Sequence, residues 1–289
     1  TDEPPREGGG WSHDYCCPED GARLRFRSDQ PHKHLCPACN KEWEGPKLDA
    51  VWRGTVHSQF ADAASDLALV YQLTGEERYG RAAARILCWY ADHYADFPLG
   101  RGPAGRGKVM SQSLSECTWL ITMMRAADLA WPVLTGDERV RIERDLVRAG
   151  AEHIHRFTFG IHNIQCWHNA CYASAGYFLG DPDMIREARD GDLGFKNQVE
   201  KGIMEDGMWF ERSMGYHSYT LNALVTHCEA ARHAGENLHQ LGRMRLMFTL
   251  PLRLAQPNLV VPSLNDQGYS RGTISPEPLE RAVAWYQDD

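Results

Sequence analysis

The chain has little positive charge and no long hydrophobic run. Its 31 Lys and Arg residues are outnumbered by 39 Asp and Glu residues, which gives a formal net charge of −8. A general nucleic-acid binder needs a basic surface to release counterions from phosphates, so the composition argues against that class. No uninterrupted apolar run approaches the roughly 18 residues that suggest a membrane span, so we expect no contact with a membrane.

The N-terminus lacks the features of a secretory leader. The stretch TDEPPREGGGW has no basic segment followed by an apolar one, so we expect that any export signal has been removed or never existed. The compartment stays unknown on this basis, and of the alternatives we favour a secreted or periplasmic location. Nine cysteines are an odd number, and several fall in apparently helical segments where a buried thiol is typical. We therefore predict no disulfide framework.

The composition is otherwise that of a folded globular protein. The hydrophobic fraction is 43% and the charged fraction 24%, far from the signature of disorder. Residues 1–50 are rich in Cys, His, Pro and Gly and show little helical periodicity, whereas the pattern becomes helical from about Thr55 onward. We predict a small Cys/His-rich module at 1–50 and one helical catalytic domain at 51–289.

Short glycine-bearing turns recur between the helical segments. The turn at 74–78 (TGEER) is repeated almost letter for letter at 135–139 (TGDER), and 180–183 (GDPD) occupies a comparable place. Such recurrence predicts helix hairpins, and the sequence shows no convincing strand among them. The expected helices span residues 57–73, 76–95, 111–134, 137–158, 164–179, 182–190, 193–204, 214–235 and 238–254.

These hairpins predict an all-α fold. Antiparallel helix pairs close into a ring or stack into an open solenoid, and periodicity alone does not separate the two. We favour a ring with a central groove, because aromatic and polar residues crowd at helix starts in 163–169 and 209–219, as a functional rim would require.

The N-terminal module contains a metal-binding pattern. His13, Cys17, Cys36 and Cys39 form H-x3-C-x18-C-x2-C, in which two pairs can fold back into a tetrahedral, structural zinc site. A zinc-ribbon-like module this small has little core of its own, so a metal would supply folding energy. Competing ligands are Cys16, His32 and His34. The alternative without metal is free structural thiols and a solvated His-Lys-His loop.

Two segments concentrate polar and aromatic side chains. The first is 161–169 (IHNIQCWHN) and the second is 205–219 (EDGMWFERSMGYHSY). Asn163 and Ser213 both suit a helix N-cap, which is a purely structural role. That role does not explain the histidines and tyrosines around them.

At these residues the chain resembles the heparinase II/III family of polysaccharide lyases, over nearly its whole length. The matching stretches are HNIQCWHNA followed by GYFLGD, then DGMWFERSMGYHSY, and the N-terminal CPEDGARLRF with CPAC. The resemblance implies an incomplete α/α toroid and catalytic roles for His162, Asn163 and Tyr216. Some members carry histidine directly after the asparagine, where this chain has Ile164, so the base is expected at His162.

The resemblance implies cleavage of a uronate-containing glycan by β-elimination, which leaves unsaturated uronate ends. Glycosaminoglycans such as heparan, chondroitin or hyaluronan are expected first and alginate second. The reaction needs a neutralised carboxylate, a base for the C5 proton and an acid for the leaving oxygen, and no cofactor. Asn163, His162 and Tyr216 would fill these roles in that order. Alternatively Tyr216 does both proton transfers, if Arg212 or His217 lowers its pKa.

Further residues are candidates for holding the anionic polysaccharide. For the tryptophans core packing is an alternative, and for His168 a core or capping role. The basic stretch Arg101, Arg106 and Lys108 is a candidate for a locally positive cleft. The expected substrate-binding residues are Gln112, Glu116, Trp167, His168, Trp209, Glu211, Arg212, His217 and Tyr219.

Members of the resembled family usually continue into a β-sandwich domain, which this chain does not contain. We therefore expect a fragment, or a chain that acts with a missing C-terminal domain or partner. Two rival functions remain open. A glycoside hydrolase on the same helical ring would use two carboxyl groups, with Asp206 and Glu211 as candidates. A non-catalytic module would bind an acidic glycan or a protein without turnover.

Overall fold

The computed structural model describes residues 3–102, 105–266 and 272–286. The chain forms two compact units, Thr1–Phe157 and Thr158–Asp289, and each is described by itself. The predicted division into a module at 1–50 and a domain at 51–289 stays a prediction, since the module shares the first unit with helices of the predicted domain. Within the described ranges, no helix has the length and apolar character needed to cross a membrane.

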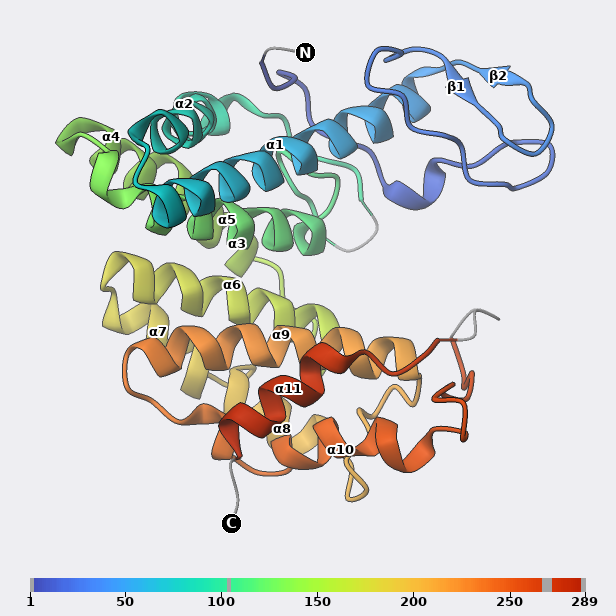
Figure 1. Ribbon diagram of the computed structural model, residues 1–289, viewed down its shortest axis with the longest axis vertical. Helices are drawn as coiled ribbons and strands as arrows, with labels where there is room; N and C mark the ends of the chain where they lie inside the picture. The colour runs from blue at the N-terminus through green and yellow to red at the C-terminus, as the bar shows by residue number, and fades with distance from the viewer. Residues whose placement is uncertain (1–2, 103–104, 267–271, 287–289) are drawn as a thin grey trace. The chain divides into compact units, whose positions relative to one another are not determined.

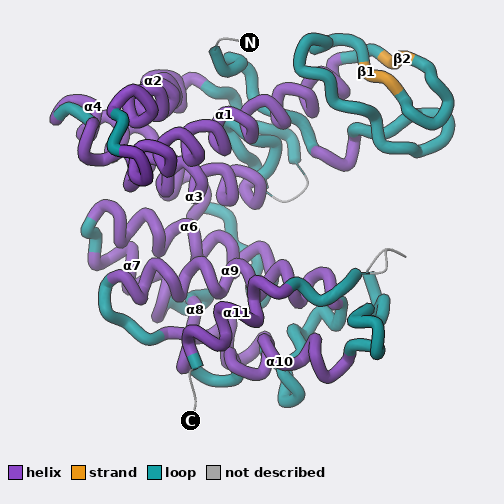
Figure 2. The backbone as a smooth tube through the Cα atoms, viewed as in Figure 1, coloured by secondary structure: helices purple, strands orange, loops and turns teal. Residues whose placement is uncertain are grey.

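The first unit joins a small module to a layer of helices (Figure 1, Figure 2). The module contains η1 (Ser12–Asp14) and an antiparallel pair, β1 (His34–Leu35) and β2 (Glu42–Trp43), with His34 opposite Trp43. Helix α1 packs on both α2 and α3. The helices are α1 (Pro46–Thr74), α2 (Glu77–His93), η2 (Tyr94–Asp96), α3 (Ser113–Ala130), η3 (Trp131–Val133), α4 (Gly136–Arg141), the π-helical η4 (Ile142–Arg148) and α5 (Ala149–His155).

Local chemistry explains where these helices begin. Helix α1 starts at Pro46, about ten residues before the predicted start, because a proline suits the first helical turn and Gly45 before it takes a φ of 141° that other residues rarely adopt. Thr135 and Glu138 form a reciprocal capping box at the start of α4. Glu138 also accepts two hydrogen bonds from Arg81 of α2, at 2.8 and 2.7 Å, which ties neighbouring hairpins together.

The three glycines at 8–10 lie with their backbone directly against the helical layer. Gly9 donates its N–H to the carbonyl of Val109 at 2.8 Å, and Gly10 donates to Ala50 at 2.7 Å. A Cβ atom on Gly9 would lie 2.5 Å from the Cα of Gly54 in α1, so a side chain does not fit there. The absence of side chains is what allows this strand-like segment to pack so closely.

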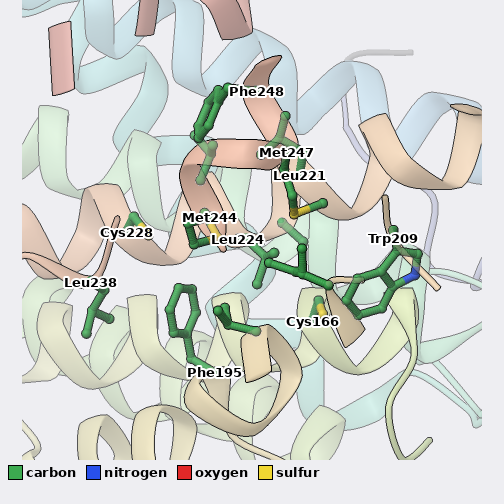
Figure 3. Close-up of a cluster of buried hydrophobic side chains, with 14 of the residues drawn as sticks. Cys166, Phe195, Trp209, Leu221, Leu224, Cys228, Leu238, Met244, Met247 and Phe248 are labelled. Carbon is green, nitrogen blue, oxygen red and sulfur yellow. The ribbon is translucent and has the colours of Figure 1, made fainter. Parts of the chain in front are cut away.

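The second unit contains a large buried apolar cluster (Figure 3). Phe195, Trp209, Leu224 and Phe248 are among its side chains, and each is at most 2% exposed. Helix α11 was not among the predicted helices. The elements are α6 (Asn163–Leu179), α7 (Pro182–Asp190), α8 (Phe195–Gly202), α9 (Met214–His233), η5 (Leu238–Gln240), α10 (Met244–Leu254) and α11 (Pro276–Trp285).

Helices α6 and α9 lie side by side and run in the same direction (Figure 1). At one end Asn163, the first residue of α6, bonds to Glu211 just before α9. At the other end the Tyr177 hydroxyl donates to Glu236, just after α9, at 2.9 Å. The N-termini of both helices therefore lie at the same end of the unit, and this brings the two polar segments of the sequence together.

Candidate active site

The starts of α6 and α9 are fixed by side-chain caps. His162 has an extended backbone, and its Nδ1 accepts the N–H of Ile164 at 3.1 Å. Ser213 caps α9, since its Oγ accepts the N–H of Tyr216 at 3.3 Å. The cap of α6 is thus His162 and not Asn163, whereas Ser213 takes the capping role that its sequence position allowed.

Glu211 lies at the centre of the contacts between the two helix starts. The Asn163 Nδ2 donates to both carboxylate oxygens, at 3.0 and 2.9 Å, and the Asn163 backbone N–H donates at 3.3 Å. The indole Nε1 of Trp209 donates to the same carboxylate at 2.6 Å. This corrects the expected role of Asn163: its amide is 2% exposed and occupied by Glu211, so it is not open to a substrate carboxylate.

The Tyr216 phenol is held in its protonated form. Its hydroxyl donates to Oδ2 of Asp266 at 3.2 Å. Partial burial, the hydrogen bond to Asp266, and the negative charges of Asp266 and Glu211 all raise the pKa of Tyr216 above its usual range. A tyrosine that keeps its proton at neutral pH is suited to act as an acid.

His217 carries no positive charge that could lower the pKa of Tyr216. This corrects both roles expected for that histidine, the lowering of the Tyr216 pKa and the binding of substrate. The His217 ring is 0% exposed. Its Nε2 donates to the carbonyl of Met247 at 2.9 Å, and its Nδ1 accepts the N–H of Trp209 at 3.3 Å. Burial lowers the pKa of His217, so the ring stays neutral. His217 is a structural link between backbone segments and does not bind substrate.

Two more of the expected substrate-binding side chains are buried. Trp209 is 0% exposed and belongs to the apolar cluster, so it cannot stack on a sugar ring. His168 is 2% exposed, and its ring packs edge-on against Phe159 at 5.4 Å. These two expectations are wrong, because both side chains face the core of the unit.

Other expected residues remain accessible near the helix starts. The rings of Trp167 and Tyr219 are half-buried and pack against each other at 5.2 Å, one from each helix. Arg212 is exposed and has a φ of 56°, in the left-handed region that a residue with a side chain adopts only at some cost. It lies between the clamped Glu211 and the cap Ser213.

Two expected substrate-binding residues belong to the first unit. Glu116 is 0% exposed and accepts the Tyr94 hydroxyl at 2.9 Å and three backbone N–H groups from residues 108–110. It is therefore an anchor for that loop and not a substrate ligand; burial raises its pKa. Gln112 is the residue before α3 and is half-buried, with its Nε2 at 3.4 Å from the Ser115 hydroxyl.

The metal-binding pattern is assembled in part. Cys17, Cys36 and Cys39 lie together, and their fourth neighbour is Asp20, with all ligand atoms within 4.8 Å of one another. His13 is exposed and stacks on Trp11, with ring centroids 4.7 Å apart, which corrects its place as a ligand.

All nine cysteines are free, in agreement with the expected absence of a disulfide framework.

The loop before residue 267 contributes contacts that the sequence did not indicate. Asp266 accepts the Tyr216 hydroxyl, and Asn265 donates its Nδ2 to the backbone carbonyl of Glu211 at 3.3 Å. The sequence stretch PSLND shows no helical or strand pattern, so nothing in it pointed to a place beside Tyr216.

Comparison with known proteins places these observations in a family context. A family model described as alginate lyase matches residues 3–245. The exo-oligoalginate lyase of Saccharophagus degradans is 28% identical over 187 residues, which cover 60% of this chain and 25% of that protein. The alginate lyase of Stenotrophomonas maltophilia is 28% identical over 177 residues, which cover 57% of this chain and 24% of that protein. The chain thus spans about a quarter of the length of these curated relatives.

Solved structures show the same fold. Alginate lyase A1-III from Sphingomonas species A1 matches with a TM-score of 0.65 at 18% identity, over 100% of this chain and 78% of that chain. A histidine-to-alanine variant of alginate lyase A1-III, complexed with tetrasaccharide, matches with the same TM-score over 86% of this chain and 75% of that chain. The predicted all-α fold of the α/α toroid class is confirmed. The polysaccharide-lyase relationship is supported, but the matching family model is that of alginate lyases and the finer resemblance to heparinase II/III is not shown.

Proposed function

The chain belongs to the alginate lyase family, and from this premise we propose that it cleaves alginate by β-elimination. Alginate moves ahead of the glycosaminoglycans that the sequence favoured, because the curated relatives are named alginate and exo-oligoalginate lyases. The observation that carries the proposal is the protonated Tyr216 phenol at the common start of α6 and α9, three residues after Ser213, the residue that caps α9.

An anionic sugar polymer suits this end of the unit. The backbone N–H groups at the starts of two parallel helices concentrate partial positive charge there, which the carboxylates of Glu211 and Asp266 offset in part. Arg212 adds a full positive charge on an exposed side chain. We assign Arg212 the neutralisation of the uronate carboxylate, in place of Asn163, since a cation beside the carboxylate makes the C5 proton more acidic.

The base is assigned by comparing the free-energy cost of using His162 with that of using Tyr216. With Nδ1 of His162 capping α6, the ring carries its proton on Nε2, so it acts as a base only after the cap bond is given up. Losing such a cap costs about 1 kcal/mol. Deprotonating a tyrosine of ordinary pKa at pH 7 costs about 4 kcal/mol, and here the pKa is raised further. His162 is therefore the base.

The proton transfers then follow in order. His162 takes the C5 proton, the electron pair forms the C4–C5 double bond, and the glycosidic C4–O bond breaks. Tyr216 gives its phenolic proton to the leaving oxygen, while Asp266 holds the hydroxyl in place beforehand. The half-buried pair Trp167 and Tyr219 lies on the same two helices and offers an aromatic surface for a neighbouring sugar ring.

The test is absorbance near 232 nm during incubation with alginate, alongside hyaluronan, chondroitin sulfate and heparan sulfate. Only an elimination creates the conjugated unsaturated uronate. Tyr216→Phe is expected to lower the rate by about 10²- to 10⁴-fold, as general-acid catalysis implies. Tyr71→Phe, which removes a half-buried phenol from helix α1 of the other unit, serves as the control and is expected to keep a rate within about tenfold of the unaltered chain.

Each other outcome has a defined meaning. New reducing ends without absorbance would overturn the lyase proposal in favour of a hydrolase; Glu211, clamped by Asn163 and Trp209, would then have to be released. Binding of alginate without turnover, unchanged in Tyr216→Phe, would overturn it in favour of a non-catalytic module. A signal with a glycosaminoglycan but not with alginate would support the β-elimination reaction and refute alginate as the substrate.

A further inference from the structure

We propose that Cys17, Asp20, Cys36 and Cys39 bind one zinc ion that holds the N-terminal module together. This inference is independent of the proposed function, because it concerns a different unit and a structural role. It keeps three of the ligands expected from sequence and replaces His13 by Asp20.

The strongest argument is that two turns of the module are the same structure built twice. The first is 17–21 (CPEDG) and the second is 36–40 (CPACN). In each, the fifth residue donates its N–H to the carbonyl of the first, at 2.9 Å for Gly21 and 3.0 Å for Asn40. In each, the same fifth residue has positive φ, 71° for Gly21 and 58° for Asn40.

The repeat extends to the residue after each turn. The N–H of Cys17 donates to the carbonyl of Ala22 at 2.8 Å, and the N–H of Cys36 donates to the carbonyl of Lys41 at 2.8 Å. Within this frame Asp20 occupies the position that Cys39 holds in the second turn. Two such turns, each with ligands at its first and fourth residues, form the four-ligand arrangement of structural zinc sites.

The distances fit a tetrahedral ion. Zinc bonds of about 2.3 Å to sulfur and about 2.0 Å to oxygen place two sulfur atoms about 3.8 Å apart and a sulfur and an oxygen about 3.5 Å apart. The Sγ atoms of Cys17 and Cys39 are 3.8 Å apart. The Sγ of Cys36 lies 3.4 Å from Oδ2 of Asp20. The one sulfur–sulfur distance and the one sulfur–oxygen distance therefore match those expected between two ligand atoms of a tetrahedral zinc ion.

The surroundings explain why a metal is needed there. The module's apolar cluster consists of few side chains, chiefly Tyr15 and Leu24 with the thiols themselves, resting on Leu48 and Val51 of α1. So small a core supplies little folding energy, whereas a structural zinc contributes its binding free energy directly.

The other candidate ligands are engaged elsewhere. His34 is buried; its Nε2 lies 2.9 Å from Oδ1 of Asp49 and its Nδ1 lies 2.8 Å from the Tyr15 hydroxyl. His32 pairs with the other oxygen of Asp49 at 2.7 Å. The Sγ of Cys16 points to the carbonyl of His13, at 3.6 Å. None of these side chains joins the four-ligand group.

The experiment measures metal content of the full chain by mass spectrometry after dialysis. About one zinc per chain is expected, retained in His13→Ala and in Cys16→Ser, and lost in Cys36→Ser and Asp20→Ala. Cys16→Ser is the matched control for loss of a thiol, because it removes the neighbour of a ligand. Thermal melting with and without a chelator checks that the unaltered chain loses stability when zinc is removed.

Substitution by Co²⁺ identifies the fourth ligand even if Asp20→Ala fails to fold. The unaltered chain is expected to show the visible bands of a tetrahedral thiolate site, and Asp20→Cys to fold, keep the metal and gain sulfur-to-cobalt charge-transfer intensity. An unchanged spectrum in Asp20→Cys, or loss of metal in His13→Ala, would return the fourth position to another residue and overturn the assignment. Absence of zinc and of cobalt binding from the unaltered chain would overturn the site itself.

Discussion

Replacing Glu211 by glutamine is expected to destabilise the second unit although the two side chains have nearly the same shape. The carboxylate accepts the Trp209 indole N–H at 2.6 Å and the Asn163 amide at 2.9 Å. A neutral acceptor weakens each of these bonds by about 1 kcal/mol, and the new NH₂ group faces a donor, which leaves one polar group unpaired at a further cost of about 1 kcal/mol. The expected total is about 3 kcal/mol.

The assay is thermal unfolding followed by circular dichroism. For a unit of this size, about 3 kcal/mol lowers Tm by roughly 10 °C. Glu205→Gln is the control, because Glu205 is exposed in the turn that precedes Trp209 and its replacement is expected to change stability by less than about 0.5 kcal/mol. A Tm for Glu211→Gln within about 2 °C of that of the unaltered chain would refute the stabilising role of the contacts that Glu211 makes with Trp209 and Asn163.

A double-mutant cycle tests whether Asn163 and Glu211 act together. If the contact joins the two helix starts energetically, Asn163→Ala and Glu211→Gln are expected to be non-additive by about 1 to 2 kcal/mol. Additive effects would mean that each residue stabilises its own segment only. The initial rate on alginate, measured in the same variants below their Tm, is expected to fall with the loss of the clamp, since His162 and Tyr216 are positioned by the two starts it connects.

Two further predictions concern pH. The hydrogen bonds from Arg81 hold the pKa of Glu138 at about 2, below its ordinary 4.5, so this carboxylate stabilises the fold above the ordinary value and the contribution is lost as pH falls toward 2. Glu138→Gln is expected to lower the stability by about 1 kcal/mol at pH 7, a small value because Arg81 is partly exposed and solvent screens the ion pair. Near pH 2 the variant and the unaltered chain are expected to have the same Tm. A Tm difference of equal size at both pH values would contradict this. Burial and the bond to Asp266 raise the pKa of Tyr216, so Asp266→Asn is expected to move the alkaline limb of the pH–kcat profile to lower pH, and a shift to higher pH would show that Tyr216 is not the acid.

Much of the helical fold could be predicted from periodicity and turn residues. The glycine-bearing turns at 74–78, 135–139 and 180–183 all lie at helix ends. The start of α1 was missed because the composition of the first 50 residues suggested a separate module, whereas Pro46 already begins the helix. Composition describes a segment, but a helix start depends on one or two residues.

The site was predicted in outline but not in its division of roles. Along α9, Met214, His217, Leu221 and Leu224 recur at helical spacing and are all buried. His217 therefore lies on the core face, whereas Tyr216 beside it is only partly buried. That signal was present in the sequence. Helix α6, in contrast, is buried on most sides, so no periodicity could have separated His168 from its apolar neighbours.

The contacts made by unpatterned loops were beyond prediction. The position of Asp266 beside Tyr216 depends on how the chain returns after α10, and no local pattern encodes that path. The ligand Asp20 is different, because comparing CPEDG with CPACN residue by residue would have aligned it with Cys39. A search limited to histidine and cysteine spacing passed over it.

The glycines at 8–10 also bear on how tolerant this chain is to change. Where backbone meets backbone, at Gly9 against Gly54, the smallest possible insertion, a methyl group, displaces the segment as a whole. In a saturation library these positions would therefore stand out as intolerant of substitution. For protein engineering this sets a practical boundary: a tag or linker sequence cannot replace this stretch.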